Sequence, residues 1–287
     1  MRRFLISLLF ALIVCAAPTA GAEDLKAGER KVLTVDGIEY AFRWCPPGEF
    51  MMGSPEGEPG RNDEKNDEKL HQVKLTKGFW MLETEVTQEM WESVMGENPS
   101  EFKGPWKPVE KVNWEECQSF CRKLSGKLGQ KVQIPTEAQW EYACRAGTTG
   151  VFAGDLDSMA WYKKNSKEMT HTVGQKEPNA WGLHDMHGNV WEMCADWYGS
   201  SYYEVSPMTD PENSTRPTFP LNLPETEKGS ITVSCVSPPR VCRGGAWDLS
   251  NGDCRSAKRG GFYRGSRNSS LGLRVILVPN QESNVRR

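Results

Sequence analysis

The second half of the chain limits its possible folds most strongly, because it has almost no regular hydrophobic periodicity. From Gly147 onward the sequence is rich in Gly, Asn, Trp and Pro and shows no sustained helical or alternating pattern. Such sequences build domains in which loops surround small sheets. Together with the clearer helices and short strands of the first half, this feature predicts an α+β domain with little regular secondary structure.

Local signals mark two helices in the first half of the chain. Asn113 with Glu116, and Thr136 with Gln139, have the spacing of capping boxes, and Gly147 supplies a stop signal for the second helix. Apolar residues recur at helical spacing after each cap, so one face of each helix is expected to be buried.

Strand and loop signals are weaker. Alternation over residues 31–43 around Asp36–Gly37 predicts a strand pair with a tight turn. A further strand is expected over 71–75 and a short helix over 87–95. The charged stretch 57–69 is interpreted as a solvated loop.

The N-terminus has the pattern of a signal peptide. Arg2 and Arg3 precede an apolar run over residues 4–14, and Ala20–Ala22 provides a small-residue cleavage site. This predicts export, with the mature protein periplasmic or secreted; lipidation at Cys15 is the less favoured alternative. No apolar run is long enough for a membrane span. The expected organisation is a signal peptide over 1–22, an N-terminal strand segment over 23–42, a main domain over 43–279 with an insertion at 210–240, and a tail over 280–287.

Charge and cysteine content exclude some functions. The net charge is -3, and the Lys and Arg residues are scattered among acids, so nucleic-acid binding is not expected. The chain has nine cysteines, of which Cys15 lies in the signal peptide. An even number in an exported chain permits disulfides, but their pairing does not follow from the sequence. No CxxC spacing appears, which argues against structural zinc.

A series of motifs then appears in a fixed order along the chain. They are Pro46–Ser54, Glu83–Gln88, Pro108–Val109, Val112–Trp114, Pro135–Ala143, Gly182–Glu192, Arg243–Trp247, Arg255–Ala257 and Leu271–Arg274. The series resembles the sulfatase-modifying-factor family, which includes formylglycine-generating enzyme, over roughly residues 43–278. The resemblance implies a loop-rich mixed fold related to C-type lectins.

The same resemblance implies which residues oxidase activity would require. The family's enzymes oxidise a sulfatase cysteine to formylglycine with two cysteines that bind Cu(I) and follow a Gly-Gly-Ser turn. Here the turn ends at Ala246, and the two positions fall on Leu249 and Cys254 when counted from it. Counted back from Arg255, Cys254 occupies neither position. The catalytic pair is missing in both alignments, and Cys254 is only a weak catalytic candidate.

The resemblance also implies a disulfide and a metal site. The disulfide would join Cys144 to Cys254. The metal site would bind calcium through the side chains of Asp185 and Glu192. The backbone carbonyls of Gly188 and Val190 would be further ligands. The alternative is that Glu192 pairs with an arginine and Asp185 caps a turn.

Other candidate residues have weaker claims. His184, His187 and Cys194 permit a transition-metal site, which is less favoured because the histidines lie in a glycine-containing loop. Three tryptophans are expected in the core, with ligand stacking as the alternative: Trp191, Trp197 and Trp247.

We therefore expect an exported, non-oxidising, calcium-stabilised module that binds an unidentified small ligand or protein. The alternative function is a formylglycine-generating oxidase that would use Cu(I) and act on an exported sulfatase.

Overall fold

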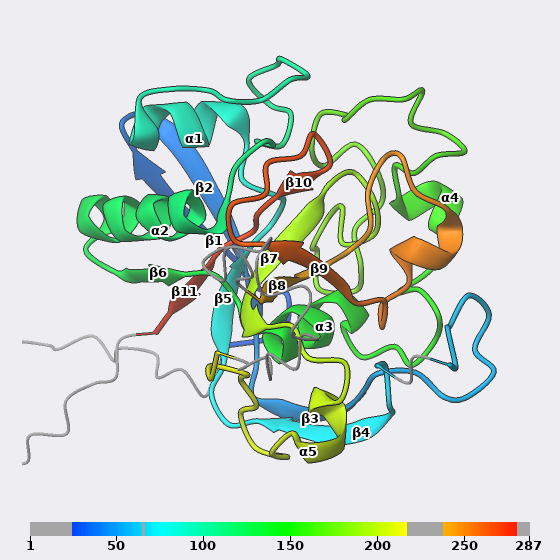
Figure 1. The fold of residues 1–287 in the computed structure, drawn as a ribbon. Helices are drawn as coiled ribbons and strands as arrows, with labels where there is room; N and C mark the ends of the chain where they lie inside the picture. Colours follow the sequence, from blue (N-terminus) through cyan, green and yellow to red (C-terminus); the bar gives the residue numbers. More distant parts are fainter. Residues whose placement is uncertain (1–24, 65–66, 217–237, 280–287) are drawn as a thin grey trace, which may run out of the picture.

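A computed structural model of the chain describes residues 25–64, 67–216 and 238–279 (Figure 1). The predicted signal peptide, the C-terminal tail and most of the insertion with Cys235 lie outside the described residues. Within the described ranges, none of the helices combines the length and apolar character needed to cross a membrane.

The largest sheet has five strands and joins the two ends of the domain. Its order is β1-β2-β5-β11-β6, so the last strand of the chain lies between β5 and β6. All neighbouring pairs are antiparallel. The strands are β1 (Arg30–Val35), β2 (Ile38–Cys45), β5 (Phe79–Leu82), β6 (Lys131–Gln133) and β11 (Ile276–Val278).

Two smaller sheets lie in the described residues. A four-stranded sheet has the order β10-β7-β8-β9, and a hairpin pairs β3 with β4. These strands are β3 (Gly48–Met52), β4 (His71–Leu75), β7 (Trp191–Trp197), β8 (Pro239–Arg243), β9 (Gly260–Tyr263) and β10 (Leu271–Gly272).

The helices are short and lie against the sheets. They are α1 (Gln88–Met95), α2 (Trp114–Leu128), α3 (Glu137–Arg145), α4 (Leu156–Met159) and α5 (Tyr202–Val205). Helix α2 packs on β6 and α1, while α3 packs on β3, β7 and β8 (Figure 1). Long loops make up much of the remainder, as expected for this fold class.

The predicted local signals are confirmed. Both capping boxes form, and α3 ends at Ala146 with a left-handed φ of 44° just before Gly147. The turn between β1 and β2 has positive φ at Asp36 (51°) and Gly37 (83°), as a two-residue hairpin turn requires.

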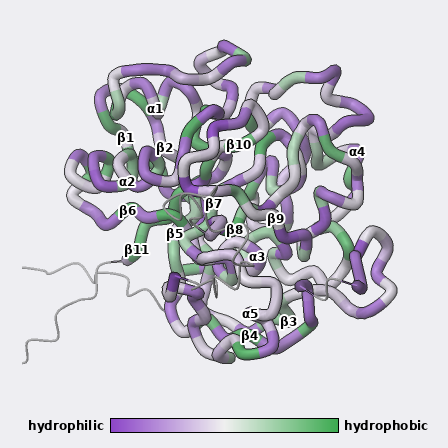
Figure 2. Tube along the Cα trace, in the orientation of Figure 1, coloured by the Kyte–Doolittle hydropathy of each residue, from purple (hydrophilic) through white to green (hydrophobic). Residues whose placement is uncertain are grey.

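The hydrophobic core follows the central strands (Figure 2). One cluster fills the space between the five-stranded sheet, α1 and α2, and a second lies around α3, β7 and β8. The predicted apolar face of α2, which includes Cys117 and Cys121, is buried in the first cluster.

The prediction of a solvated loop over 57–69 was wrong for part of that segment. The side chains of Glu58 and Glu68 are largely buried because both pair with Arg255, which is itself fully buried. These ion pairs attach the loop to the C-terminal part of the chain, a long-range contact that its composition did not indicate.

Candidate functional site

The C-terminal loop holds Cys254 in an enclosed position. Gly244 and Gly245 both have positive φ, and a Cβ atom at Gly245 would lie 2.7 Å from the Cys254 sulfur. Cys254 is 0% exposed and packs with apolar residues of the segment Leu156–Tyr162. Burial raises the pKa of its thiol to about 12, so the thiol is protonated at neutral pH.

The other position that corresponds to a catalytic cysteine carries no thiol. Leu249 is partly buried and packs against the main core cluster. The chain therefore lacks the two adjacent sulfur ligands that Cu(I) favours at this loop.

The predicted Cys144–Cys254 disulfide is not formed in the structure, where both cysteines are free. The imidazole of His187 connects the two segments instead. Its Nε2 lies 3.8 Å from the Cys144 sulfur and accepts a hydrogen bond from the Ala153 amide, while Nδ1 lies 2.8 Å from the Cys254 carbonyl oxygen. This arrangement assigns the proton to Nδ1, and burial lowers the pKa of His187 to about 4.

The remaining thiols of the described residues are buried as well, although Cys121 lines a pocket beside α2. All seven cysteines in this part of the chain are free and buried. Burial is the main cause of a raised pKa at every one of them: Cys45, Cys117, Cys121, Cys144, Cys194, Cys242 and Cys254. None has the exposed, electropositive surroundings that make a cysteine reactive.

The carboxylate of Glu192 is occupied by an arginine. Arg274 donates from Nη2 to Glu192 Oε1 at 2.7 Å and from Nε to both oxygens at 3.0 Å. Trp140 Nε1 donates to Oε2 at 2.6 Å. The structure thus shows the alternative in which Glu192 pairs with an arginine, and calcium at Glu192 would have to displace Arg274.

Asp185 has a different environment and retains a free oxygen. Its φ is 56°, and Oδ2 accepts a hydrogen bond from the Gly174 amide at 2.7 Å. Oδ1 is buried with no hydrogen-bond partner, as is Oε1 of the neighbouring Glu85. Burial raises the pKa of Asp185 to about 6; for Glu85, burial and then the charge of Asp185 raise the pKa well above its usual range.

Two unsatisfied carboxyl oxygens in one buried region fit a cation ligand set. Glu85 has no motif-based calcium role, so sequence reasoning missed it. Because no group of three or more His, Cys, Asp or Glu side chains is suitably placed for a metal within the described ranges, a cation here would also need backbone carbonyls.

The contacts of His184 and His187 argue against the transition-metal alternative. His187 contacts Cys144 rather than Cys194, and His184 Nδ1 lies 2.8 Å from the Lys176 carbonyl oxygen. The structure does not bring His184, His187 and Cys194 together.

Most charged residues of the sequence motifs are instead buried ion-pair partners. Arg274 pairs with Glu192, and Arg243 with Glu141. Two further pairs join Arg259 to Glu137 and Arg255 to Glu68. These pairs connect α3, β7, β8 and the C-terminal loops, and their charged groups are occupied by one another.

An aromatic surface lies beside the C-terminal loop. It consists of Phe102, Trp106, Trp161, His171 and Trp247, of which Trp106 is exposed and the others are half-buried. The Phe102 and Trp247 rings meet edge to face at 5.3 Å, and the Trp161 and His171 rings stack at 3.8 Å. The Trp106 carbonyl accepts a hydrogen bond from the Val173 amide, and Trp106 is 64% exposed.

This surface was only partly foreseen. Trp191 and Trp197 are buried, as expected, whereas Trp247 is half-buried.

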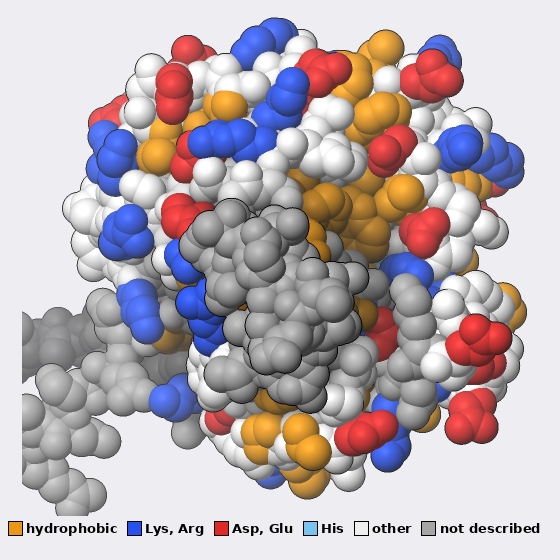
Figure 3. All heavy atoms as spheres, viewed as in Figure 1, with side chains coloured by type: hydrophobic (Ala, Val, Ile, Leu, Met, Phe, Trp, Pro, Cys, Tyr) orange, Lys and Arg blue, Asp and Glu red, His pale blue; other side chains and the backbone are white. Residues whose placement is uncertain are grey.

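On the face drawn in Figure 3, Lys and Arg side chains are interspersed with Asp and Glu, and hydrophobic side chains gather near the region of β9 and β10.

In the part of the chain that the structure describes, three sheets, long loops and a framework of buried ion pairs define a loop-rich α+β domain of the C-type-lectin-like class. Residues 39–278 match the family described as sulfatase-modifying factor enzyme 1-like domain, and the chain belongs to this family.

Known relatives differ in their described roles. The chain is 28% identical over 225 residues to the chaperone protein LppX of Paenibacillus barcinonensis, covering 59% of this chain and 75% of LppX. It is 35% identical over 124 residues to the formylglycine-generating enzyme of Streptomyces coelicolor, covering 37% of this chain and only 38% of the enzyme.

A solved structure supports the fold over nearly the whole domain. Treponema denticola variable protein 1 superposes with a TM-score of 0.72 at 29% identity, covering 87% of this chain and 99% of that protein. The comparisons therefore establish the family and the fold.

Proposed function

We propose that this protein is a non-oxidising member of its family that binds a ligand or a partner protein through the aromatic surface beside the C-terminal loop. The burial of every described thiol carries the proposal, because Cu(I)-dependent oxidation needs two accessible sulfur ligands. A role as an exported protein rests on the signal-peptide pattern at the N-terminus.

The exposed indole of Trp106 supports binding at this surface. Large aromatic side chains that remain exposed on a rigid scaffold are frequent binding residues. Lys107 and Lys176 lie over the Phe102 and Trp161 rings, with Nζ 5.7 Å and 4.4 Å from the ring centroids. The surface thus combines apolar area with positive charge.

Thiol accessibility tests the proposal directly. In a mature chain carrying Cys235→Ser, we expect no thiol to react rapidly with Ellman's reagent while the protein is folded, and seven to react in denaturant. A fast-reacting thiol in the folded protein that disappears in Cys254→Ser would instead support the oxidase alternative.

We also propose that calcium stabilises the domain at Asp185. The orphaned oxygens of Asp185 and Glu85 support this ligand set, with the carbonyls of Gly188 and Val190 as further ligands implied by the family resemblance. A bound calcium ion would offset the unfavourable burial of two acids and would leave the Glu192–Arg274 pair intact.

Calcium at saturating concentration is expected to raise the melting temperature of the wild type by about 5 °C, since a ligand that binds only the folded state stabilises it. Asp185→Asn should abolish the shift. Asp36→Asn is the matched control, because Asp36 also has a positive φ but lies exposed in a hairpin turn. An equal shift in Asp185→Asn and wild type would rule out this site.

A further inference from the structure

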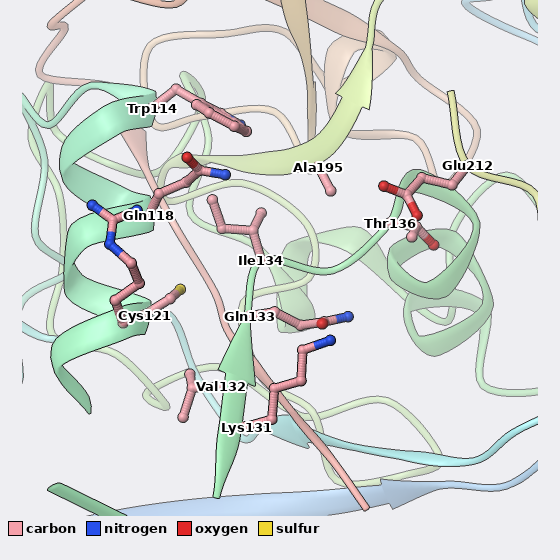
Figure 4. Close-up of a pocket in the computed structure, with 11 residues that line it drawn as sticks. Trp114, Gln118, Cys121, Lys131, Val132, Gln133, Ile134, Thr136, Ala195 and Glu212 are labelled. Atoms are coloured by element: carbon pink, nitrogen blue, oxygen red, sulfur yellow. The ribbon is translucent and has the colours of Figure 1, made fainter. Parts of the chain in front are cut away.

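A pocket of about 480 Å³ lies away from the aromatic surface, between α2, β6, the start of α3 and β7 (Figure 4). Its floor is apolar and buried, and includes Trp114, Val132 and Ile134. A pocket of this size with an apolar floor can enclose a small ligand or one residue of a peptide.

The rim of the pocket carries polar side chains that have no partner among the described residues. The side chains of Gln118, Arg122, Lys131, Gln133 and Glu212 line the pocket, and none of them makes a hydrogen bond or ion pair with another described residue. In Figure 4, Lys131 and Gln133 extend toward Thr136 and Glu212, while Gln118 projects from α2 on the opposite side. Two amides and three charged groups are thus available to a ligand.

The outer edge of β6, the strand at the pocket, cannot pair with a further strand at Val132. β6 is an edge strand, but its Val132 amide donates to Ser125 Oγ at 2.9 Å, and Ser125 Oγ lies 3.3 Å from the Val132 carbonyl oxygen. An extended peptide therefore cannot pair with β6 at this point, and recognition must use the side chains of the rim.

The composition of the rim indicates the chemistry of the ligand. The pocket is lined by two cations, Arg122 and Lys131, and by one acid, Glu212, so its excess positive charge favours an anion. The carboxamides of Gln118 and Gln133 can each donate to and accept from an amide group. The apolar floor complements an aliphatic or aromatic side chain.

We propose that this pocket binds a small carboxylate that also carries an amide and an apolar side chain. This is the chemistry of the C-terminal residue of a peptide and of a free N-acyl amino acid. The pocket is also lined by Cys121, but the inference does not use its thiol or the aromatic surface, so it is independent of the proposed function.

The test is a titration of the ¹⁵N-labelled mature chain followed by NMR. N-acetyl-L-leucine is the probe, and the side-chain amide signals of Gln118 and Gln133 are the readout, assigned by their loss in Gln118→Leu and Gln133→Leu. We expect both signals to shift and N-acetyl-L-leucinamide, which lacks the charge, to bind at least about fivefold more weakly.

Variants locate the charge recognition. Lys131→Gln should weaken binding of the acid by about fivefold or more, whereas Lys123→Gln, an exposed lysine of α2 outside the pocket lining, should leave it unchanged. Equal binding of acid and leucinamide, unchanged affinity in Lys131→Gln, or no shift of either amide signal would overturn the proposal.

One longer probe distinguishes the two sources of the ligand. An acetylated Gly-Gly-Leu peptide that binds more tightly than N-acetyl-L-leucine would identify a peptide C-terminus. If the peptide binds more weakly than N-acetyl-L-leucine, the pocket takes the free N-acyl amino acid. Both results support the shared chemistry.

Discussion

Replacement of Arg274 by methionine is expected to lower the free energy of unfolding by about 3–5 kcal/mol, the usual cost of breaking a buried ion pair from one side. Arg274 is fully buried and Glu192 is 1% exposed at its side chain. The variant would leave the Glu192 carboxylate buried near the unpaired oxygens of Glu85 and Asp185. It would also remove donors to the carbonyls of Leu82 and His184. Urea denaturation of both proteins measures the difference.

A similar pair on the surface provides the control. Arg267 pairs with Glu116 through two hydrogen bonds of 2.6 Å, but their side chains are 47% and 26% exposed. Arg267→Met should therefore cost less than about 1 kcal/mol. The double variant Arg274→Met/Glu192→Gln should recover part of the loss. Equal effects of the two single arginine variants would contradict the structural role assigned to Arg274.

Gly188→Ala is the second change with a large expected effect, a loss of about 3 kcal/mol or more. Gly188 has φ of 82°, and an added methyl carbon would overlap the carbonyl oxygen of Trp161 and lie 2.9 Å from its carbonyl carbon. The Trp161 oxygen accepts a hydrogen bond from the Asn189 amide, so it cannot move away without breaking that contact. Strain and a lost hydrogen bond therefore add.

Gly96→Ala separates the cost of the left-handed backbone from the cost of the close contact with Trp161. Gly96 also has a positive φ, 87°, but nothing lies within 4 Å of an added Cβ. Its cost should be limited to the left-handed conformation, about 1–2 kcal/mol. If thermal and urea denaturation give Gly188→Ala the same cost as Gly96→Ala, close approach to Trp161 is not the reason for glycine at this position.

The parts of the fold that could be predicted from the sequence are those set by neighbours in the chain. The caps at Asn113 and Thr136 bond to amides three residues later, and the Asp36–Gly37 turn joins adjacent strands. Each depends on a few consecutive residues, so a short pattern is enough to identify it.

The candidate site was harder to predict because the residues that pair with one another in it are distant in sequence. Glu192 and Arg274 are 82 residues apart, and Arg255 and Glu68 are 187 apart. The acids and arginines of the motifs are conspicuous as charges, but their pairing requires the fold. The same reasoning explains why the structure lacks the expected Cys144–Cys254 disulfide. No local pattern in the sequence indicates that His187 lies between the segments of these two cysteines.

This explains why the motifs predict fold better than activity. A family resemblance carried by buried ion pairs reports on the framework, and one framework can support different functions. The aromatic surface and the α2–β6 pocket lie outside most of those motifs. Trp106 is one of 11 tryptophans, and only the structure shows that it is exposed.

The most direct test of the central claim is mass spectrometry of a sulfatase-motif cysteine peptide incubated with the mature protein, Cu(I), a reductant and oxygen. An active formylglycine-generating enzyme in a parallel incubation is the positive control. The buried thiols predict an unchanged peptide with this protein. Formation of the aldehyde product by the wild type, and its loss in Cys254→Ser, would contradict a non-oxidising role.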